Sequence, residues 1–416
     1  MLGKRFSIGL RTALTMFTST LLVASSWATP HESVLHSFNN NGADGVNPYA
    51  GLIFDAAGNL YGTSVQGGIH SLGTVFELTH TQGGGWTETV LHSFGRGTDG
   101  AGPYGSLIFD GAGNLYGTTQ LGGIHNGGTV FELTPTQGGG WTETVLHSFN
   151  DNGTDGAYPL ASLIFDAAGN LYGTTQQGGI HSCKGKTCGT VFEMTPREGG
   201  GWSESVLHSF GNGTDGVNPQ GSLISDASGN LYGTTYQGGI HSQGTVFEMT
   251  PRDGGGWTET VLHSFGRGTD GVSPNATLIF DTTGNLYSTT IAGGIHNGGT
   301  VFELSPQDGG GWTETVLHSF GSGTDGANPQ AGLVIDATGN LYGTAITGGI
   351  HSDGAVFELS PQPGGGWAET VLHSFGNGAD GINPYAGLIV DAAGNLYGTT
   401  VAGGTHADGA VFEIAP

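Results

Sequence analysis

Residues 333–375 read LVIDATGNLYGTAITGGIHSDGAVFELSPQPGGGWAETVLHSF, and this stretch decides the fold. It holds four short runs rich in aliphatic, aromatic and threonine side chains, at 333–336, 340–344, 355–359 and 367–375. Such residues favour β-strands, whereas the glycine-rich segments between the runs favour turns. The DATGN segment at 336–340 is typical of a tight hairpin with a left-handed glycine. The stretch therefore predicts four consecutive antiparallel strands, which we call A to D.

This unit recurs seven times along the chain. The string VLHSF begins at Val34, Val90, Val145, Val206, Val261, Val316 and Val371. The spacing is 55 or 56 residues, except for one of 61 that reflects an insertion at 182–188. Seven units of four strands predict an all-β, seven-bladed β-propeller, with an open solenoid as the competing architecture.

The two ends of the repeat array favour the propeller. The first D strand, at 32–38, has no A to C strands before it, and the last unit stops after its C strand at 410–414. The spare N-terminal strand can complete the last blade and so close a ring, whereas a solenoid would leave edges at both ends. We therefore expect one propeller domain over residues 29–416, closed in a 3+1 arrangement.

Residues 1–28 differ from the repeats. Lys4, Arg5 and Arg11 precede an apolar run, and Ser26-Trp27-Ala28 fits a cleavage site, so the segment reads as a secretory signal peptide. The alternative is an N-terminal membrane anchor, but the run is short and contains several Ser and Thr. We expect a secreted, periplasmic or cell-surface protein, with no membrane span in the mature chain.

Composition limits the partners. The chain has 83 glycines, 9 Lys or Arg and 34 Asp or Glu, for a formal charge of −25 that becomes −28 without the three basic residues of the signal. Nucleic acids and anionic lipids are bound through clustered basic residues, so both are excluded. Most glycines occupy fixed places between strands, which indicates turns rather than disorder. We expect a monomer.

The repeats resemble a known family. GNLYGTT (113–119), GGIH (122–125) and GTVFE (128–132) are similar to motifs of the Gloeo/Verruco tandem-repeat (GloVer) family of exported bacterial proteins, and the match covers all seven units. The resemblance implies a propeller and export, without a particular activity. The strand pattern alone also resembles streptogramin-lyase propellers.

Some polar residues recur in every unit, and we interpret them as structural because an active site needs only one constellation. An aspartate in the D-to-A loop is expected to tie that loop to the B-to-C loop, through the histidine of GGIH or through the backbone. Glutamates of VFE and of WTET are expected to face solvent, and the Trp that opens six D strands is expected to pack between blades, with Pro30 in its place in the first strand. The aspartates are Asp44, Asp99, Asp155, Asp215, Asp270, Asp325 and Asp380, and the histidines are His70, His125, His181, His241, His296, His351 and His406.

Function should lie where the blades differ. The residue after the loop proline, which enters the inner strand near the channel mouth, is Tyr49, Tyr104 or Tyr385 in adjoining blades and Gln220, Asn275 or Gln330 in the opposite ones. Residues after the B strand add Gln120, Gln176 and Tyr236. Tyrosines beside amides suit a neutral glycan, because aromatic faces stack on sugars and amides bind hydroxyls.

We therefore expect an exported, non-catalytic binding or surface-interaction module, with a glycan or another extracellular molecule as its partner. The alternatives are a lyase- or lactonase-type enzyme and a purely structural surface protein. The inner-strand entries hold no acidic residue, and we expect no catalytic residue, metal or cofactor. Cys183 and Cys188 are the only cysteines, and in an exported protein they predict a disulfide beside Lys184 and Lys186.

Overall fold

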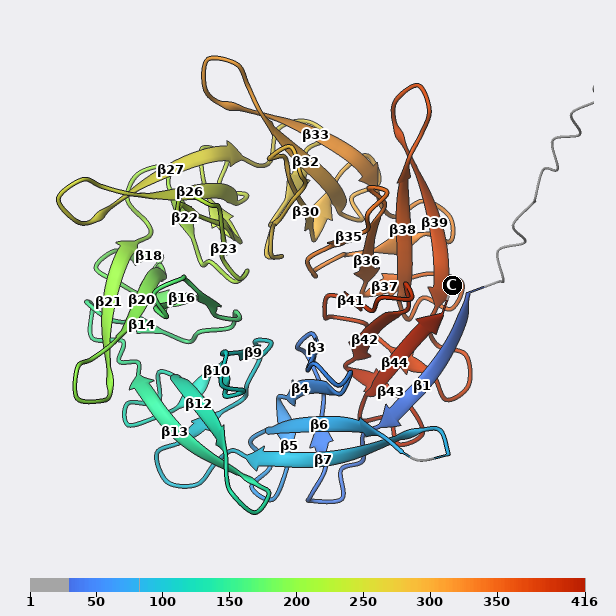
Figure 1. Cartoon of the computed structure of the whole chain (residues 1–416). Coiled ribbons are helices and arrows are strands. Elements are labelled where there is room, and N and C mark those ends of the chain that lie inside the picture. The colour runs from blue at the N-terminus through green and yellow to red at the C-terminus, as the bar shows by residue number, and fades with distance from the viewer. Residues whose placement is uncertain (1–29, 82, 416) are drawn as a thin grey trace, which may run out of the picture.

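The chain forms a ring of seven blades about a central axis, as a computed structural model shows (Figure 1). The structure describes residues 30–81 and 83–415, so the predicted signal peptide lies outside the described residues. The described residues form strands and turns, and they include no helix with the length and apolar character needed to cross a membrane.

Each blade is an antiparallel sheet of four strands, which follow one another from the axis to the rim. The inner strands are β3 (Ile53–Phe54), β9 (Ile108–Phe109), β15 (Ile164–Phe165), β23 (Ile224–Ser225), β29 (Ile279–Phe280), β35 (Val334–Ile335) and β41 (Ile389–Val390). The second strands are β4 (Leu60–Ser64), β10 (Leu115–Thr119), β16 (Leu171–Thr175), β24 (Leu231–Thr235), β30 (Leu286–Thr290), β36 (Leu341–Ala345) and β42 (Leu396–Thr400).

The two outer strands of each blade are longer. The third strands are β6 (Thr74–His80), β12 (Thr129–Pro135), β20 (Thr190–Pro196), β26 (Thr245–Pro251), β32 (Thr300–Pro306), β38 (Ala355–Pro361) and β44 (Ala410–Ala415). The outermost strands are β7 (Trp86–Ser93), β13 (Trp141–Ser148), β21 (Trp202–Ser209), β27 (Trp257–Ser264), β33 (Trp312–Ser319), β39 (Trp367–Ser374) and β1 (His31–Ser37).

On one face of the ring, a short strand pair in each blade joins the D-to-A loop to the B-to-C loop. The pairs are β2 (Gly45–Val46) with β5 (Gln66–Gly67), β8 (Gly100–Ala101) with β11 (Leu121–Gly122), β14 (Gly156–Ala157) with β17 (Gln177–Gly178), β22 (Gly216–Val217) with β25 (Gln237–Gly238), β28 (Gly271–Val272) with β31 (Ala292–Gly293), β34 (Gly326–Ala327) with β37 (Thr347–Gly348), and β40 (Gly381–Ile382) with β43 (Ala402–Gly403). A further hairpin, β18 (Ser182–Cys183) with β19 (Lys186–Thr187), forms the insertion.

The first strand completes the seventh blade. β1 pairs with β44 in antiparallel register, from His31 opposite Ala415 to Ser37 opposite Ala410, and the sheet order is β1-β44-β42-β41. Figure 1 shows the blue β1 beside the red β44. The predicted 3+1 closure is therefore confirmed, and the solenoid is excluded.

The hydrophobic core lies between the blades. One cluster joins Tyr61 and Val75 of blade 1 to Leu115 and Phe131 of blade 2. Phe94, at the end of the outer strand, is fully buried and meets Phe131 edge-on with ring centroids 5.0 Å apart. A Cβ at Gly117 would lie 2.6 Å from the Phe131 ring, so the packing at this point requires glycine. Because these aromatic side chains are buried between neighbouring blades, they stabilise the closed propeller as a whole rather than single blades.

The tryptophans pack between blades, as predicted. Trp86 packs against the cluster that joins blade 7 to blade 1, and Trp202 meets Tyr116 of the preceding blade with centroids 6.3 Å apart. The cluster between blades 6 and 7 has no tryptophan among its described residues, because Pro30 stands where the other outer strands place one.

The seam between blades 6 and 7 is thus expected to gain from a tryptophan. The substitution Pro30→Trp should stabilise the chain by about 1 kcal/mol, because it restores the aromatic area that the other seams bury. Urea unfolding of both proteins measures the difference. His31→Trp is the control, since the neighbouring side chain on a strand points to the opposite face. A Pro30→Trp variant no more stable than the His31→Trp variant would contradict the assignment.

Candidate functional site

The seven D-to-A loops bring one side chain each to the mouth of the central channel. These side chains are Tyr49, Tyr104, Leu160, Gln220, Asn275, Gln330 and Tyr385, and together they line a cavity of about 290 Å³ at the mouth. The same seven side chains also line a second cavity of about 280 Å³ that continues along the inner strands. The ring of side chains therefore lies between a shallow outer pocket and the channel below.

Each loop is held in place by the neighbouring blade. Asn47 adopts a left-handed conformation with φ of 56°, and its side chain donates a hydrogen bond to the Val401 carbonyl of blade 7 at 2.8 Å. The Thr399 hydroxyl of the same blade donates to the Ala50 carbonyl at 3.0 Å. Tyr49 thus stands between two anchored positions.

The threonine anchor recurs at every seam. The hydroxyls of Thr63, Thr118, Thr174, Thr234, Thr289 and Thr344 each donate to a carbonyl of the next D-to-A loop. The role of these threonines is not among the predictions from the sequence, although they occupy one fixed place in the LYGTT motif. Their hydrogen bonds fix the backbone that presents the mouth residues.

Tyr49 packs between the other two tyrosines of the mouth. The ring centroid of Tyr49 lies 5.2 Å from that of Tyr104 and 4.9 Å from that of Tyr385, and all three side chains are half-buried. Burial raises the pKa of Tyr49 above its usual value of 10, and the neighbouring phenols raise it further. Burial also raises the pKa of Tyr104. The phenols of Tyr49 and Tyr104 therefore stay neutral and can donate hydrogen bonds.

The opposite side of the mouth presents amides. The Asn275 side chain donates to the Gln330 amide oxygen at 3.4 Å, a long contact. The Asn275 amide oxygen is buried and accepts no hydrogen bond from the described residues. A buried acceptor without a donor is costly, so this oxygen favours a ligand or a water molecule that carries one.

The remaining predicted binding residues are spread over the same face. Gln120 lines the outer pocket together with the tyrosines. Gln176 lines a different cavity, which lies beside the insertion. Tyr236 is half-buried and lines neither of these cavities. The structure thus brings Gln120 to the mouth but leaves Gln176 and Tyr236 away from it.

The repeated aspartates bind a histidine other than the one expected. Each aspartate faces the histidine of VLHSF at the end of the outer strand, with Nε2 to carboxylate distances of 3.0 to 3.4 Å. The pairs are His36–Asp44, His92–Asp99, His147–Asp155, His208–Asp215, His263–Asp270, His318–Asp325 and His373–Asp380.

The GGIH histidines are therefore not the partners of these aspartates. His70, His125, His241, His296, His351 and His406 are exposed, and His181 is half-buried. The tie between the two loops is made by the backbone, for example by Gly68 N–H, which donates to the Asp44 carbonyl at 2.7 Å. The carboxylate serves its own loop, since Asp99 also accepts a hydrogen bond from Gly95 N–H at 2.8 Å.

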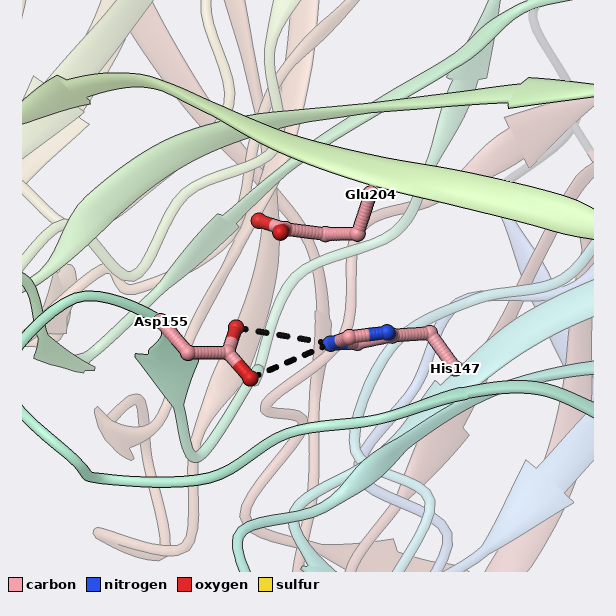
Figure 2. Close-up of side chains that lie close together, drawn as sticks. All are labelled: His147, Asp155 and Glu204. Atoms are coloured by element: carbon pink, nitrogen blue, oxygen red, sulfur yellow. Dashed lines mark hydrogen bonds and ion pairs between the residues drawn. The ribbon is translucent and has the colours of Figure 1, made fainter.

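The prediction that the glutamates face solvent is wrong. The WTET glutamate of each blade points toward the His–Asp pair of the preceding blade, as Figure 2 shows for Glu204 beside His147 and Asp155. Burial and, to a smaller extent, the Asp155 carboxylate raise the pKa of Glu204 to about 7, against the opposing effect of His147. The glutamate of VFE is half-buried too, and Glu77 accepts a hydrogen bond from the Tyr61 hydroxyl at 2.7 Å.

His147, Asp155 and Glu204 are also the residues that come nearest to a metal-binding set. Their potential ligand atoms lie within 4.8 Å of one another. The Asp155 oxygens, however, already accept hydrogen bonds from Asn150 and Gly156 N–H and face His147. Because the same trio of residue types recurs at every seam, we interpret it as a structural contact between blades, in which the histidine pairs with the aspartate and one glutamate oxygen is buried without a hydrogen-bond partner among the described residues.

A family model for the Gloeobacter/Verrucomicrobia repeat matches residues 20–200 and 182–412. The chain belongs to this family. No curated protein matches it. The seven blades are thus family repeats, and the mouth residues are the places where this member varies from blade to blade.

The chain also shows similarity to several solved structures, all at low sequence identity. A putative 6-phosphogluconolactonase from Bacteroides uniformis is 14% identical, with 78% of this chain and 84% of that chain covered and a TM-score of 0.48. A putative glucose dehydrogenase from Thermus thermophilus is 16% identical, with 93% and 100% covered and a TM-score of 0.43. A protein of unknown function from Dyadobacter fermentans is 12% identical, with 82% and 97% covered and a TM-score of 0.41. We assign no activity to this chain from these similarities.

Proposed function

We propose that this repeat protein is an exported, non-catalytic binding module whose channel mouth takes a neutral glycan. The observation that carries the proposal is the contact of three tyrosines from adjoining blades, opposite an amide side with a buried acceptor at Asn275. Tyrosine faces stack on the apolar faces of sugar rings, and amides exchange hydrogen bonds with hydroxyls.

The chemistry of the pocket favours binding over catalysis. The described residues that line the two axial cavities include no carboxylate, imidazole, amine or guanidinium group. A lyase or lactonase would need an acid, a base or metal ligands at this point. Neutral phenols and amides instead match an uncharged ligand rich in hydroxyls.

Two features support export. Residues 1–28 have the composition of a secretory signal peptide, although they lie outside the described residues. Cys183 and Cys188 form the predicted disulfide, with an S–S distance of 2.02 Å, which fits an extracellular or periplasmic protein. The proposed ligand is therefore an extracellular or cell-wall glycan.

Single substitutions in the tyrosine cluster should weaken glycan binding strongly. On an array of neutral oligosaccharides, Tyr49→Ala and Tyr385→Ala are expected to weaken binding at least about tenfold, because each removes a stacking surface. The Tm should stay nearly unchanged, since the mouth lies outside the clusters between blades. Tyr236→Ala is the matched control and should bind as the unmodified chain does. Equal binding by all four proteins would refute the proposal, as would a wild type that binds no neutral glycan.

A further inference from the structure

The insertion of blade 3 is a rigid hairpin. β18 and β19 pair Ser182 with Thr187 and Cys183 with Lys186. The two-residue turn between them, Lys184-Gly185, has φ values of 51° and 84°, as in the turns that match the twist of two paired strands. The disulfide between Cys183 and Cys188 closes the hairpin, so Lys184 on the turn and Lys186 on β19 both belong to a covalently closed loop.

Packing holds this hairpin against two blades. Cys188 is fully buried in the cluster that joins blades 3 and 4. A Cβ at Gly211, in the next D-to-A loop, would collide with both sulfurs of the disulfide. The Cys188 carbonyl accepts a hydrogen bond from Asn218 N–H at 2.8 Å, and the Thr187 hydroxyl donates to Asp151 at 3.1 Å. The insertion therefore has a fixed place on the face that also bears the channel mouth.

A cavity of about 610 Å³ lies between the hairpin and blade 4. Its volume is about twice that of the pocket at the channel mouth. The side chains that matter for recognition come from both blades and are Lys184, Lys186, Gln176, Gln177, Asn218 and Gln237. This mixture of ammonium and amide groups occurs in a chain that has only six basic residues beyond residue 28.

Lys184 and Lys186 are the charged side chains of this cavity that form no ion pair with a carboxylate among the described residues. The ion pairs found among the described residues all join a histidine to an aspartate, so none uses Lys184 or Lys186. Asp215 also lines the cavity, but its two oxygens face Gly211 N–H at 2.8 Å and His208 at 3.2 Å. An incoming anion therefore meets two ammonium groups whose charge is not already taken by a neighbouring carboxylate.

We propose that this cavity is a second ligand site that binds an anionic saccharide, meaning a sugar that carries a carboxylate or a sulfate. The anionic group pairs with Lys184 and Lys186, because charge-assisted hydrogen bonds are the strongest that such a surface offers. The amides of Gln176, Gln177 and Gln237 take the sugar hydroxyls. The site is separate from the channel mouth and does not depend on the function proposed there.

The test measures binding of three probes to the mature chain: galacturonate oligomers, sulfated galactan oligomers and uncharged galactan oligomers. We expect at least one anionic probe to bind and its affinity to fall as sodium chloride rises from 50 to 300 mM, on the order of the screening expected for exposed charges. The double variant K184A/K186A should bind that probe at least about tenfold more weakly. K184R/K186R keeps both charges and should retain most of the affinity.

Two further variants separate this site from the channel mouth and from folding. Tyr49→Ala should leave binding of the anionic probe unchanged, whatever it does to neutral glycans. C183S/C188S should keep the Tm within a few degrees and weaken the anionic probe, because the turn is no longer fixed. The proposal is overturned if neither anionic probe binds, or if K184A/K186A binds as tightly as the unmodified chain.

Discussion

The propeller is expected to lose stability steeply as the solution turns from weakly acidic to alkaline, with an apparent Tm about 10 °C lower at pH 8.5 than at pH 5.5. The cause is the glutamate that each outer strand places at a seam between blades. Burial, with a contribution from a neighbouring aspartate in all seven, raises the pKa of each of these carboxyl groups from 4.5 to about 7. The seven residues are Glu32, Glu88, Glu143, Glu204, Glu259, Glu314 and Glu369.

The sign follows from proton binding. Folding raises the pKa of these carboxyl groups, so near pH 6 the folded chain keeps protons that the unfolded chain has released. The stabilisation is complete below about pH 4.5 and disappears as the pH rises through about 7. After a discount for partial exposure, each seam contributes about 1 kcal/mol. Seven contributions of the same sign are comparable with the whole free energy of unfolding of a typical domain.

Other groups limit the gain on the acid side. Burial lowers the pKa of His92, His318 and His373, despite their aspartate partners. The stability that this provides is complete above the unfolded pKa near 6.5 and is lost as the pH falls below it through the lowered pKa of the folded state. Partial burial opposes the shift, but the hydrogen bonds of the tight turns together outweigh it and lower the pKa of Asp110 and Asp166, so these turns weaken below about pH 4. The maximum of stability is therefore expected between about pH 5 and 6.

Circular dichroism melts at constant ionic strength measure this profile. A variant with all seven seam glutamates changed to Gln should have a much flatter profile between pH 6 and 8.5, because it has no seam proton to lose. The matched control, E198Q/D253N/D308N, removes negative charge at exposed positions and should keep the wild-type slope. A wild-type Tm that stays level or rises from pH 6 to 8 would contradict the account.

The burial of the seam glutamates could have been predicted from the sequence. Residues two apart on a strand share a face, so the contact of Trp86 with the preceding blade also brings Glu88 to that seam. In a propeller both faces of each sheet meet a neighbouring blade, so an alternating pattern does not mark a solvent side. The repeat pattern that predicted seven blades therefore also held the information needed to place the glutamates at the seams.

The partner of each aspartate could not be predicted in the same way. Asp99 lies near two histidines, His70 and His92. The spacing of these residues in the sequence does not predict which of the two the aspartate contacts. In the structure the loop turns back onto its own strand, and His92 lies 3.3 Å away. The repeat pattern predicted the blades, their order and the tyrosines at the mouth. The sizes of the two axial cavities and the presence of the larger cavity beside the insertion depend on side-chain packing. No sequence motif predicts this packing.

Removal of the first strand is expected to destroy the cooperative fold. Deletion of residues 30–38 takes β1 from blade 7, leaves the β44 edge without a partner, and removes the fully buried Phe38. Loss of a buried phenylalanine side chain alone costs about 3–5 kcal/mol, and the backbone pairing is lost in addition. An exposed strand edge also recruits other chains, so size-exclusion chromatography should show oligomers or aggregates. The melt should lose its single sharp transition.

A circular permutant distinguishes loss of the strand from a general sensitivity of this end of the chain. The permutant opens the exposed turn between residues 83 and 84 and joins Pro416 to Pro30 through TQGGG, the segment at 136–140 that joins the equivalent strands of blade 2. His31 already lies opposite Ala415, so this short hairpin spans the join without strain. All seven blades keep their strands, and the closing strand becomes β7. The permutant should melt within a few degrees of the wild type. If it fails to fold, or if the truncated chain melts like the wild type, closure by β1 is not what holds the ring together.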